Sequence, residues 1–287
     1  MRLASFEVSG RSCVGAVLGT EVTDLQVDEG LESLLPLSLP DVERRLARAA
    51  PSQSHALADV RLRAPILRPD KILGIGANFT DFVDEARAAG LQLPPDPIWF
   101  DRPRRCVCGP DDEVWIPDGC DDLDYEGELV VVIGRSCRGV SRDRAAEVIG
   151  GYTIGNDITM RRRAMRAPLL GKSFDTHAPI GPVLLTPDEL GDPQDVRIRT
   201  YVNGELRQNG TTRDMILDCY AQIATLSEVM TLSPGDLIFS GTPAGCGLSR
   251  TPPRPLFAGD IVSVEIDGIG RLTNTIANAP LSSTDRL

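Results

Sequence analysis

From Lys71 to the neighbourhood of the C-terminus, short apolar runs alternate with glycine-rich turns. The runs KILGIGANF, ELVVVIGR and GYTIGNDIT have the apolar content of buried strands. The pairs Asn203-Gly204 and Asp267-Gly268 are typical of hairpin turns that demand positive φ. Tandem hairpins imply antiparallel pairing, so this pattern predicts a mainly β fold with α+β elements.

Helical spacing is confined to a few segments. The segment RDRAAEVIGG, residues 142–151, predicts a helix closed by Gly150 and Gly151. The segment MILDCYAQIATLSEVM, residues 215–230, carries apolar residues at helical spacing and predicts the one long helix.

A small β-rich unit is predicted at the N-terminus. RLASFEV and CVGAVL have the pattern of short strands, and VERRLARAA has the pattern of an amphipathic helix. After Pro69-Asp70 the sequence changes to apolar runs separated by glycines. We therefore predict a small N-terminal domain over residues 1–69 and a larger domain, which carries the chemistry, over residues 70–287.

Composition excludes several classes of protein. The chain has 287 residues, 41% of them hydrophobic, which is enough for a sizeable core. Its 30 basic and 41 acidic side chains give a net charge of −11, which argues against a nucleic-acid partner. The longest apolar run, Leu129–Ile133, is far shorter than the roughly 20 residues of a membrane span, and the N-terminus lacks an apolar signal core. We expect a cytoplasmic protein with no membrane partner.

Metal sites of nitrogen or sulfur ligands are not expected. Seven cysteines are scattered without C-x-x-C spacing, and His55 and His177 are the only histidines. There is no Walker sequence, G-x-S-x-G elbow or H-E-x-x-H, and GIGANF lacks the third glycine of a dinucleotide fingerprint. Any metal should therefore be held by oxygen atoms.

Acidic residues alternate in DLDYEGELVVV, just before an apolar run. Asp124, Glu126 and Glu128 are expected to project from one face of a strand, where a divalent cation would offset their mutual repulsion. Asp157 stands in GYTIGNDIT, a strand otherwise suited to burial, and a buried aspartate needs a partner. A solvated strand end and a local turn cap are the alternatives. Two Glu and one Asp suit Mg²⁺, and Mn²⁺ or Ca²⁺ is also compatible.

Two further residues are candidates for contacts with an anionic substrate. Lys172 in GKSFDTHAPIGP lies among apolar residues and could stabilise enolate charge, although an exposed loop lysine is the alternative. The loop FSGTPAGCG follows a strand, and its amides together with Thr242 could hold a carboxylate. A glycine-rich turn without a ligand is the alternative there.

Taken in order, these segments resemble the fumarylacetoacetate hydrolase family. The resemblance covers nearly all of residues 70–280 and implies a compact roll of mixed β-sheets with a divalent metal, commonly in a homodimer. It implies Glu126, Glu128 and Asp157 as metal ligands, Lys172 as a cation facing the substrate, and Thr242 as a contact to a substrate carboxylate. The matching stretches are KILGIGANF, PIWFDRP, DYEGELVVVIGR, GYTIGNDIT, GKSFDTHAPIGP, VNGELRQNGTTRDMI, MTLSPGDLIFSGTPAG and GDIVSVEIDGIGRLTNTI.

The lid segment departs from the family pattern. Hydrolases of the family typically carry N-Y-x-x-H-x-x-E, whose His and Glu activate water, whereas this chain has Phe82 at the histidine position. Glu85 remains, and His177 is a possible relocated base, with an ordinary loop histidine as the alternative. Asn78, which opens the segment, and Arg102, where relatives often have lysine, are expected to bind substrate.

The predicted function is metal-dependent hydrolysis of a C–C bond in a 2-oxo acid, an acylpyruvate or diketo acid, through a metal-stabilised enolate. Lys172, Glu85 and His177 are the expected catalytic residues. Decarboxylation, isomerisation or dehydration of a 2-oxo acid at the same site is the alternative, because Phe82 cannot accept a proton. A catalytically silent protein that binds an oxo acid or a protein partner is a third possibility.

Overall fold

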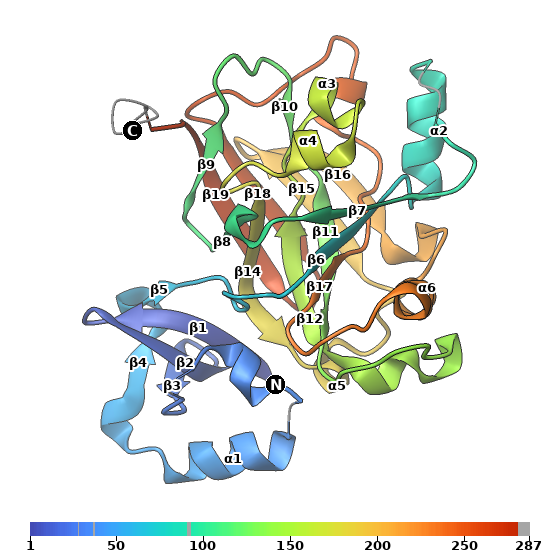
Figure 1. The fold of residues 1–287 in the computed structure, drawn as a ribbon. Coiled ribbons are helices and arrows are strands. Elements are labelled where there is room, and N and C mark those ends of the chain that lie inside the picture. The colour runs from blue at the N-terminus through green and yellow to red at the C-terminus, as the bar shows by residue number, and fades with distance from the viewer. Residues whose placement is uncertain (28, 37, 91–92, 281–287) are drawn as a thin grey trace, which may run out of the picture.

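The computed structural model describes residues 1–280 except 28, 37 and 91–92. Its largest element is a 12-stranded sheet of mixed direction, which runs through most of the molecule in Figure 1. Ten strands follow one another across it in the order β4 (Ser54–Ala56), β3 (Glu21–Asp24), β2 (Arg11–Leu18), β1 (Arg2–Val8), β14 (Ala178–Leu185), β12 (Ile149–Asn156), β11 (Gly127–Ile133), β17 (Leu237–Phe239), β6 (Ile72–Gly76) and β7 (Ile98–Arg102), while β5 (Arg61–Leu62) pairs with β1 and β8 (Val107–Cys108) pairs with β14.

A second sheet of five strands contains both predicted hairpins. Its order is β16 (Glu205–Thr211), β15 (Arg197–Val202), β18 (Ile261–Ile266), β19 (Gly270–Asn278) and β9 (Glu113–Ile116). Asn203 and Gly204, at φ 52° and 80°, join β15 to β16, and Gly268, at φ 85°, lies in the turn between β18 and β19. A two-stranded sheet pairs β10 (Leu123–Asp124) with β13 (Thr159–Met160). The predicted mainly β fold with α+β elements is confirmed.

Helices are short and lie around these sheets. They are α1 (Leu39–Arg48), α2 (Thr80–Ala88), α3 (Arg161–Ala164), α4 (Pro168–Lys172), α5 (Pro187–Leu190) and α6 (Cys219–Val229). The predicted long helix is α6, which begins later than expected because Asp218 accepts a hydrogen bond from the Ala221 amide and caps it. In the part of the chain that the structure describes, no helix has both the length and the apolar character needed to cross a membrane.

Strand β11 separates two hydrophobic cores. Leu129, Val131 and Ile133 point into a core shared with the five-stranded sheet, whereas Val130 and Val132 point into a core shared with the N-terminal strands. Every residue of β11 is buried. The apolar run in the sequence is continuous rather than alternating because both faces of this strand are covered.

The N-terminal segment shares the large sheet with the rest of the chain. Strand β1 pairs with β14 through Arg2↔Leu185 and Leu3↔Leu184, although α1 and β2–β4 lie to one side in Figure 1. The division at residue 69 remains a prediction, since backbone hydrogen bonds continue across it.

The expected helix at residues 142–151 is only partly present. A 3₁₀ helix covers Arg142–Val148, and Gly150 and Gly151 belong to β12 rather than closing a helix. The physical reason is close backbone contact. A Cβ on Gly134 would lie 2.5 Å from Gly150 Cα, so glycine is needed where the chain leaving β11 passes the start of β12.

We expect Gly134→Ala to destabilise the fold by about 1–3 kcal/mol, because the added methyl group meets backbone that cannot turn aside. Urea unfolding should show a lower midpoint with an unchanged slope. Gly76→Ala is the matched control, since the nearest atom to its new Cβ would be 3.8 Å away. Equal midpoints for the two variants would contradict the proposed tight contact.

Candidate metal centre

Antiparallel pairing of β11 with β12 brings three carboxylates together. Gly127 pairs with Asn156, so the start of β11 lies beside the end of β12, and the Asp157 amide donates to the Glu126 carbonyl at 2.8 Å. One oxygen from each of Glu126, Glu128 and Asp157 lies within 4.8 Å of the others. Asp157 follows the last residue of β12 rather than standing inside the strand as expected.

The three carboxylates are nearly inaccessible to water, with 5%, 2% and 0% of Glu126, Glu128 and Asp157 exposed. Burial, reinforced by Glu126, raises the pKa of Glu128 to about 8. Burial also acts to raise the pKa of Glu126, but the nearby cations Arg161 and Lys172 outweigh it and leave that pKa lowered. Three hard oxygen donors at this spacing suit a divalent cation, which would relieve their repulsion.

Asp124 is not one of the three clustered carboxylates, although Arg161 pairs with both Asp124 and Glu126. It belongs to β10, and the chain changes sheets before β11 begins. One carboxylate oxygen accepts the amides of Tyr125 and Gly247 at 2.9 and 2.7 Å, and the other accepts Arg161 Nε at 3.0 Å. The expectation that the three acids share one strand was therefore wrong, because Asp124 and Glu128 belong to different strands in different sheets.

Lys172 lies against the carboxylates at the end of α4. Its Nζ donates to Glu126 Oε2 at 2.7 Å, Asp157 Oδ2 at 2.6 Å and Thr159 Oγ1 at 2.8 Å. Burial lowers the pKa of this ammonium to about 8, although Glu126 acts in the opposite direction. Lys172 is therefore a buried group, not an exposed loop lysine.

Two arginines join Lys172 as cations beside the carboxylates. Arg161, the first residue of α3, pairs with Glu126 Oε1, and sequence reasoning did not select it as a site residue. The signal available was the basic triplet Arg161-Arg162-Arg163 in an acidic chain. Arg102, at the end of β7, pairs with Asp157 Oδ1, and its Nη1 donates to the His177 carbonyl at 2.7 Å. Burial lowers the pKa of Arg102 to about 10.

His177 contributes its backbone to this arrangement, while its ring turns elsewhere. The side chain is fully buried, and Nε2 lies 2.9 Å from the Trp115 carbonyl, so the neutral ring donates there. Burial lowers the pKa of His177 to about 3. At neutral pH the imidazole is uncharged and Nε2 holds its proton in that bond.

The glycine-rich loop after β17 closes another side of the centre. The Gly241 amide donates to Glu128 Oε2 at 2.8 Å, and Thr242 Oγ1 donates to the Gly127 carbonyl at 2.9 Å. Gln208 on β16 lies behind both, since its Nε2 donates to Thr242 Oγ1 at 2.8 Å and its Oε1 accepts the Gly127 amide at 3.0 Å. Sequence reasoning missed Gln208, because its position on a hairpin strand carries no local signal.

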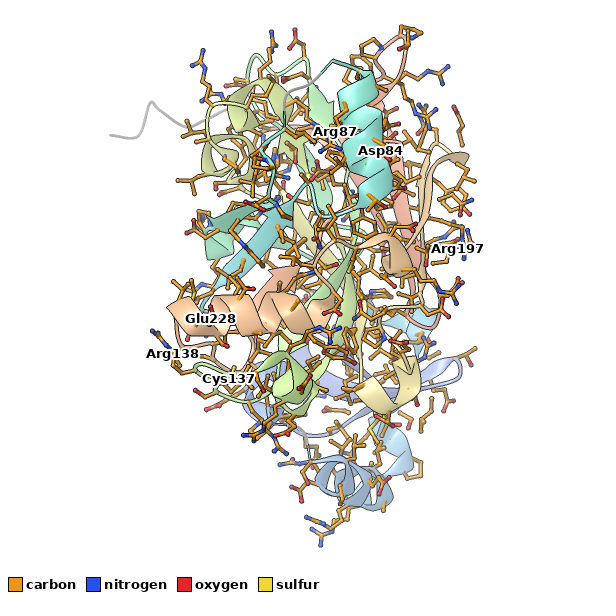
Figure 2. All side chains as sticks on the ribbon, turned by 90° about the vertical axis from the view of Figure 1, so that its right-hand side faces the viewer. Asp84, Arg87, Cys137, Arg138, Arg197 and Glu228 are labelled. Atoms are coloured by element: carbon orange, nitrogen blue, oxygen red, sulfur yellow. The ribbon has the colours of Figure 1, made fainter. Side chains whose placement is uncertain are left out.

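Helix α2, which carries the lid segment, is fastened to the same loop. Glu85 Oε2 accepts the Gly245 amide at 2.9 Å and Ser249 Oγ at 2.7 Å, and Asp81 Oδ2 accepts the Ala244 amide at 3.2 Å. Phe82 packs against the core that β11 shares with the five-stranded sheet. Figure 2 shows Asp84 and Arg87 on the outward side of this helix, where both side chains are mostly exposed.

The Asn78 side chain hydrogen-bonds backbone groups of other segments. It is 1% exposed, and its Nδ2 donates to the carbonyls of Leu217 and Ser240 at 3.0 and 2.8 Å. Its Oδ1 accepts the Leu217 amide at 2.8 Å. Of the predicted site residues, the structure therefore groups Glu126, Glu128, Asp157, Lys172 and Arg102 directly, with Thr242 alongside, and places Asn78, Glu85 and the His177 ring in other contacts.

Comparisons with known proteins find relatives over most of the chain. A protein-family model described as fumarylacetoacetate (FAA) hydrolase C-terminal matches residues 71–277. A fumarylacetoacetate hydrolase domain-containing protein 2 homologue from Dictyostelium discoideum is 35% identical and covers 92% of each chain. An oxaloacetate tautomerase from Bacillus subtilis is 38% identical and covers 96% of this chain and 100% of its own.

Solved structures are also similar to nearly the whole chain. A fumarylacetoacetate hydrolase from Exiguobacterium antarcticum has a TM-score of 0.84 at 35% identity, covering 97% of this chain and 100% of that one. Maleylpyruvate hydrolase from Sphingobium sp. SYK-6, solved with manganese(II) and pyruvate, has a TM-score of 0.78 at 32% identity, covering 98% and 100%. Because the family model spans most of the sequence, this chain belongs to the fumarylacetoacetate hydrolase family.

Proposed function

We propose that this protein is a divalent-metal-dependent tautomerase that interconverts the enol and keto forms of a 2-oxo dicarboxylate such as oxaloacetate. One observation carries the proposal: the Lys172 ammonium touches two of the three clustered carboxylates, within reach of a substrate held there. The similarity to an oxaloacetate tautomerase over 96% of the chain supports the same reaction.

Lys172 is suited to move the proton. The other two cations at the site, Arg102 and Arg161, are arginines, which stay protonated near neutral pH. A buried lysine can lose and regain its proton, and Lys172 is one of only two lysines in the sequence, with Lys71. In the enol-to-keto direction Nζ donates a proton to carbon 3 and regains one from the enol oxygen. No water is consumed, and the atoms of the substrate are conserved.

The surroundings of the site favour proton transfer over attack by water. Phe82 cannot act as a base, and the neutral ring of His177 donates to a backbone carbonyl. Glu85 already accepts two hydrogen bonds from the glycine-rich loop. A group poised to deprotonate water is a requirement of hydrolysis that tautomerisation does not share.

Glu126, Glu128 and Asp157 would hold the ion, which we propose to be Mg²⁺ because all three ligands are hard oxygen donors. A bound divalent ion supplies Lewis-acid polarisation of the 2-oxo group. Counting Asp124, four buried carboxylates face the cations of Lys172, Arg102 and Arg161. A divalent ion therefore makes the pocket net positive, which supports an anionic substrate.

Replacing Glu126 by alanine should abolish detectable binding of Mn²⁺ in titration calorimetry, because one of three ligands is lost. Glu113→Ala, which removes an exposed carboxylate on β9, is the control and should bind as the unsubstituted protein does. Unchanged affinity in the Glu126 variant would show that the ligand assignment is wrong.

The Mg²⁺-loaded protein should accelerate the loss of enol absorbance when enol-oxaloacetate is added. Lys172→Arg keeps the charge but cannot release a proton, so we expect kcat to fall by about 10²- to 10⁴-fold. Lys71→Arg is the matched control and should keep full activity, because Lys71 pairs with Asp236 at 2.9 Å and, among the described residues, with none of the three clustered carboxylates.

Product analysis by NMR in the same reactions separates the second candidate, C–C hydrolysis. This candidate is favoured by the similarity to maleylpyruvate hydrolase and by the presence of Glu85 on α2. Cleavage of an acylpyruvate without any effect on the enol-oxaloacetate signal would replace the tautomerase proposal with hydrolysis. Inertness toward both substrates would refute both.

A further inference from the structure

Arg102 is a fully buried cation whose contacts run toward the metal ligands. None of its side chain is exposed, and one end of the guanidinium pairs with Asp157 while Nη1 donates to the His177 carbonyl at 2.7 Å. An arginine removed from water this completely needs compensating contacts on its faces as well as its edge. Those contacts come from aromatic rings.

Two phenylalanines flank the guanidinium. Arg102 Cζ lies 5.8 Å from the centroid of Phe100 and 5.5 Å from that of Phe239. The Phe100 ring is also 4.9 Å from Lys172 Nζ. Both distances from the Phe100 ring are within the range at which an aromatic face attracts a cation. A single ring therefore supports two cations that would otherwise only repel each other.

A glycine makes room for that ring. Across three neighbouring strands, Phe239 of β17 pairs with Gly74 of β6, and Gly74 pairs with Phe100 of β7. Paired residues point to the same face of a sheet, so Gly74 leaves a gap between the two rings. A Cβ on Gly74 would lie 2.3 Å from Phe100 Cζ, which means that the ring rests directly over the glycine.

The two cations then share one carboxylate. Asp157 Oδ1 pairs with Arg102, and Asp157 Oδ2 accepts Lys172 Nζ at 2.6 Å. Each carboxylate oxygen has a second lone pair, so Asp157 can accept these bonds and still ligate a metal. A ligand held at both oxygens has a fixed orientation, and partners of this kind strengthen metal binding.

We propose that Phe100 is a positioning residue of the metal centre, whose ring, seated over Gly74, supports Arg102 and Lys172 and through them orients Asp157. Arg102 is accordingly a positioning residue for Asp157. This inference rests on the metal centre that the proposed function uses, but it is independent of the reaction catalysed there.

Substitutions that keep the charge test it through Mn²⁺ affinity in titration calorimetry. Phe100→Leu removes the ring face and should raise the Kd for Mn²⁺ by about 3- to 30-fold, the range of a cation–π contact. Phe100→Tyr keeps the ring and should bind within about threefold of the unsubstituted protein, by the same measure. Trp99→Leu is the matched control on β7, because Trp99 packs against the core that β11 shares with the five-stranded sheet. The Kd of this variant for Mn²⁺ should not change.

Arg102→Lys gives an independent readout if Phe100→Leu does not fold. Lysine keeps the charge but lacks the planar fork that reaches Asp157 and the His177 carbonyl together, so the Kd for Mn²⁺ should rise by about 10- to 100-fold. Unchanged Kd in Arg102→Lys, or a Phe100→Leu variant that loses thermal stability without weaker Mn²⁺ binding, would overturn the inference.

The two proposals fail in different ways. Absence of enol-oxaloacetate turnover in the unsubstituted, Mn²⁺-binding protein would refute the tautomerase function and leave the affinity comparison valid. Normal turnover combined with equal Mn²⁺ affinities in all variants would refute the positioning role alone. An unsubstituted protein that binds no Mn²⁺ would overturn both the metal centre and this inference.

Discussion

The antiparallel pairing of β11 with β12 is the constraint on which the site depends. It sets the start of one strand beside the end of the other, so that Glu126 and Glu128 lie next to Asp157 on adjacent, hydrogen-bonded strands. Sheet geometry is rigid over this range, because a slip of one residue would turn Glu128 and every other side chain of β11 to the opposite face. Such a slip would carry the Glu128 carboxylate into the core that Leu129 and Val131 now fill, and an unpaired charge buried there is costly.

Burying this many charges shapes the rest of the centre. An unpaired carboxylate in the interior is costly, and each of the clustered acids is met by a cation or an amide from a different part of the chain. Lys172 comes from α4, Arg161 from α3, Arg102 from β7 and the Gly241 amide from the loop after β17. The charges that make the site capable of chemistry therefore also tie these four segments to the acids of β11 and β12.

Sequence patterns predicted the features that depend on local chemistry. The hairpins at Asn203-Gly204 and Asp267-Gly268 were confirmed, and the positive φ of Asn203, Gly204 and Gly268 is one that Asn and Gly adopt readily. The helix predicted at residues 142–151 was wrong at its end, since Gly150 is needed for a backbone contact with Gly134 that no local pattern encodes. The resemblance to the family indicated the acidic ligands, whereas Arg161 and Gln208 emerged only from contacts between distant segments.

By itself, the sequence determined the strand-rich character of the chain, its acidic balance and the presence of hard oxygen ligands, because these follow from residue type and short spacing. Only the tertiary structure decided which groups each of these side chains contacts. It put Asp124 and Glu128 on different strands, turned the His177 ring toward Trp115 and bound Glu85 to the glycine-rich loop. The reason is physical: a side chain's role in a buried site is set by which neighbours satisfy its charge and hydrogen bonds, and those neighbours lie up to about half the chain away in sequence.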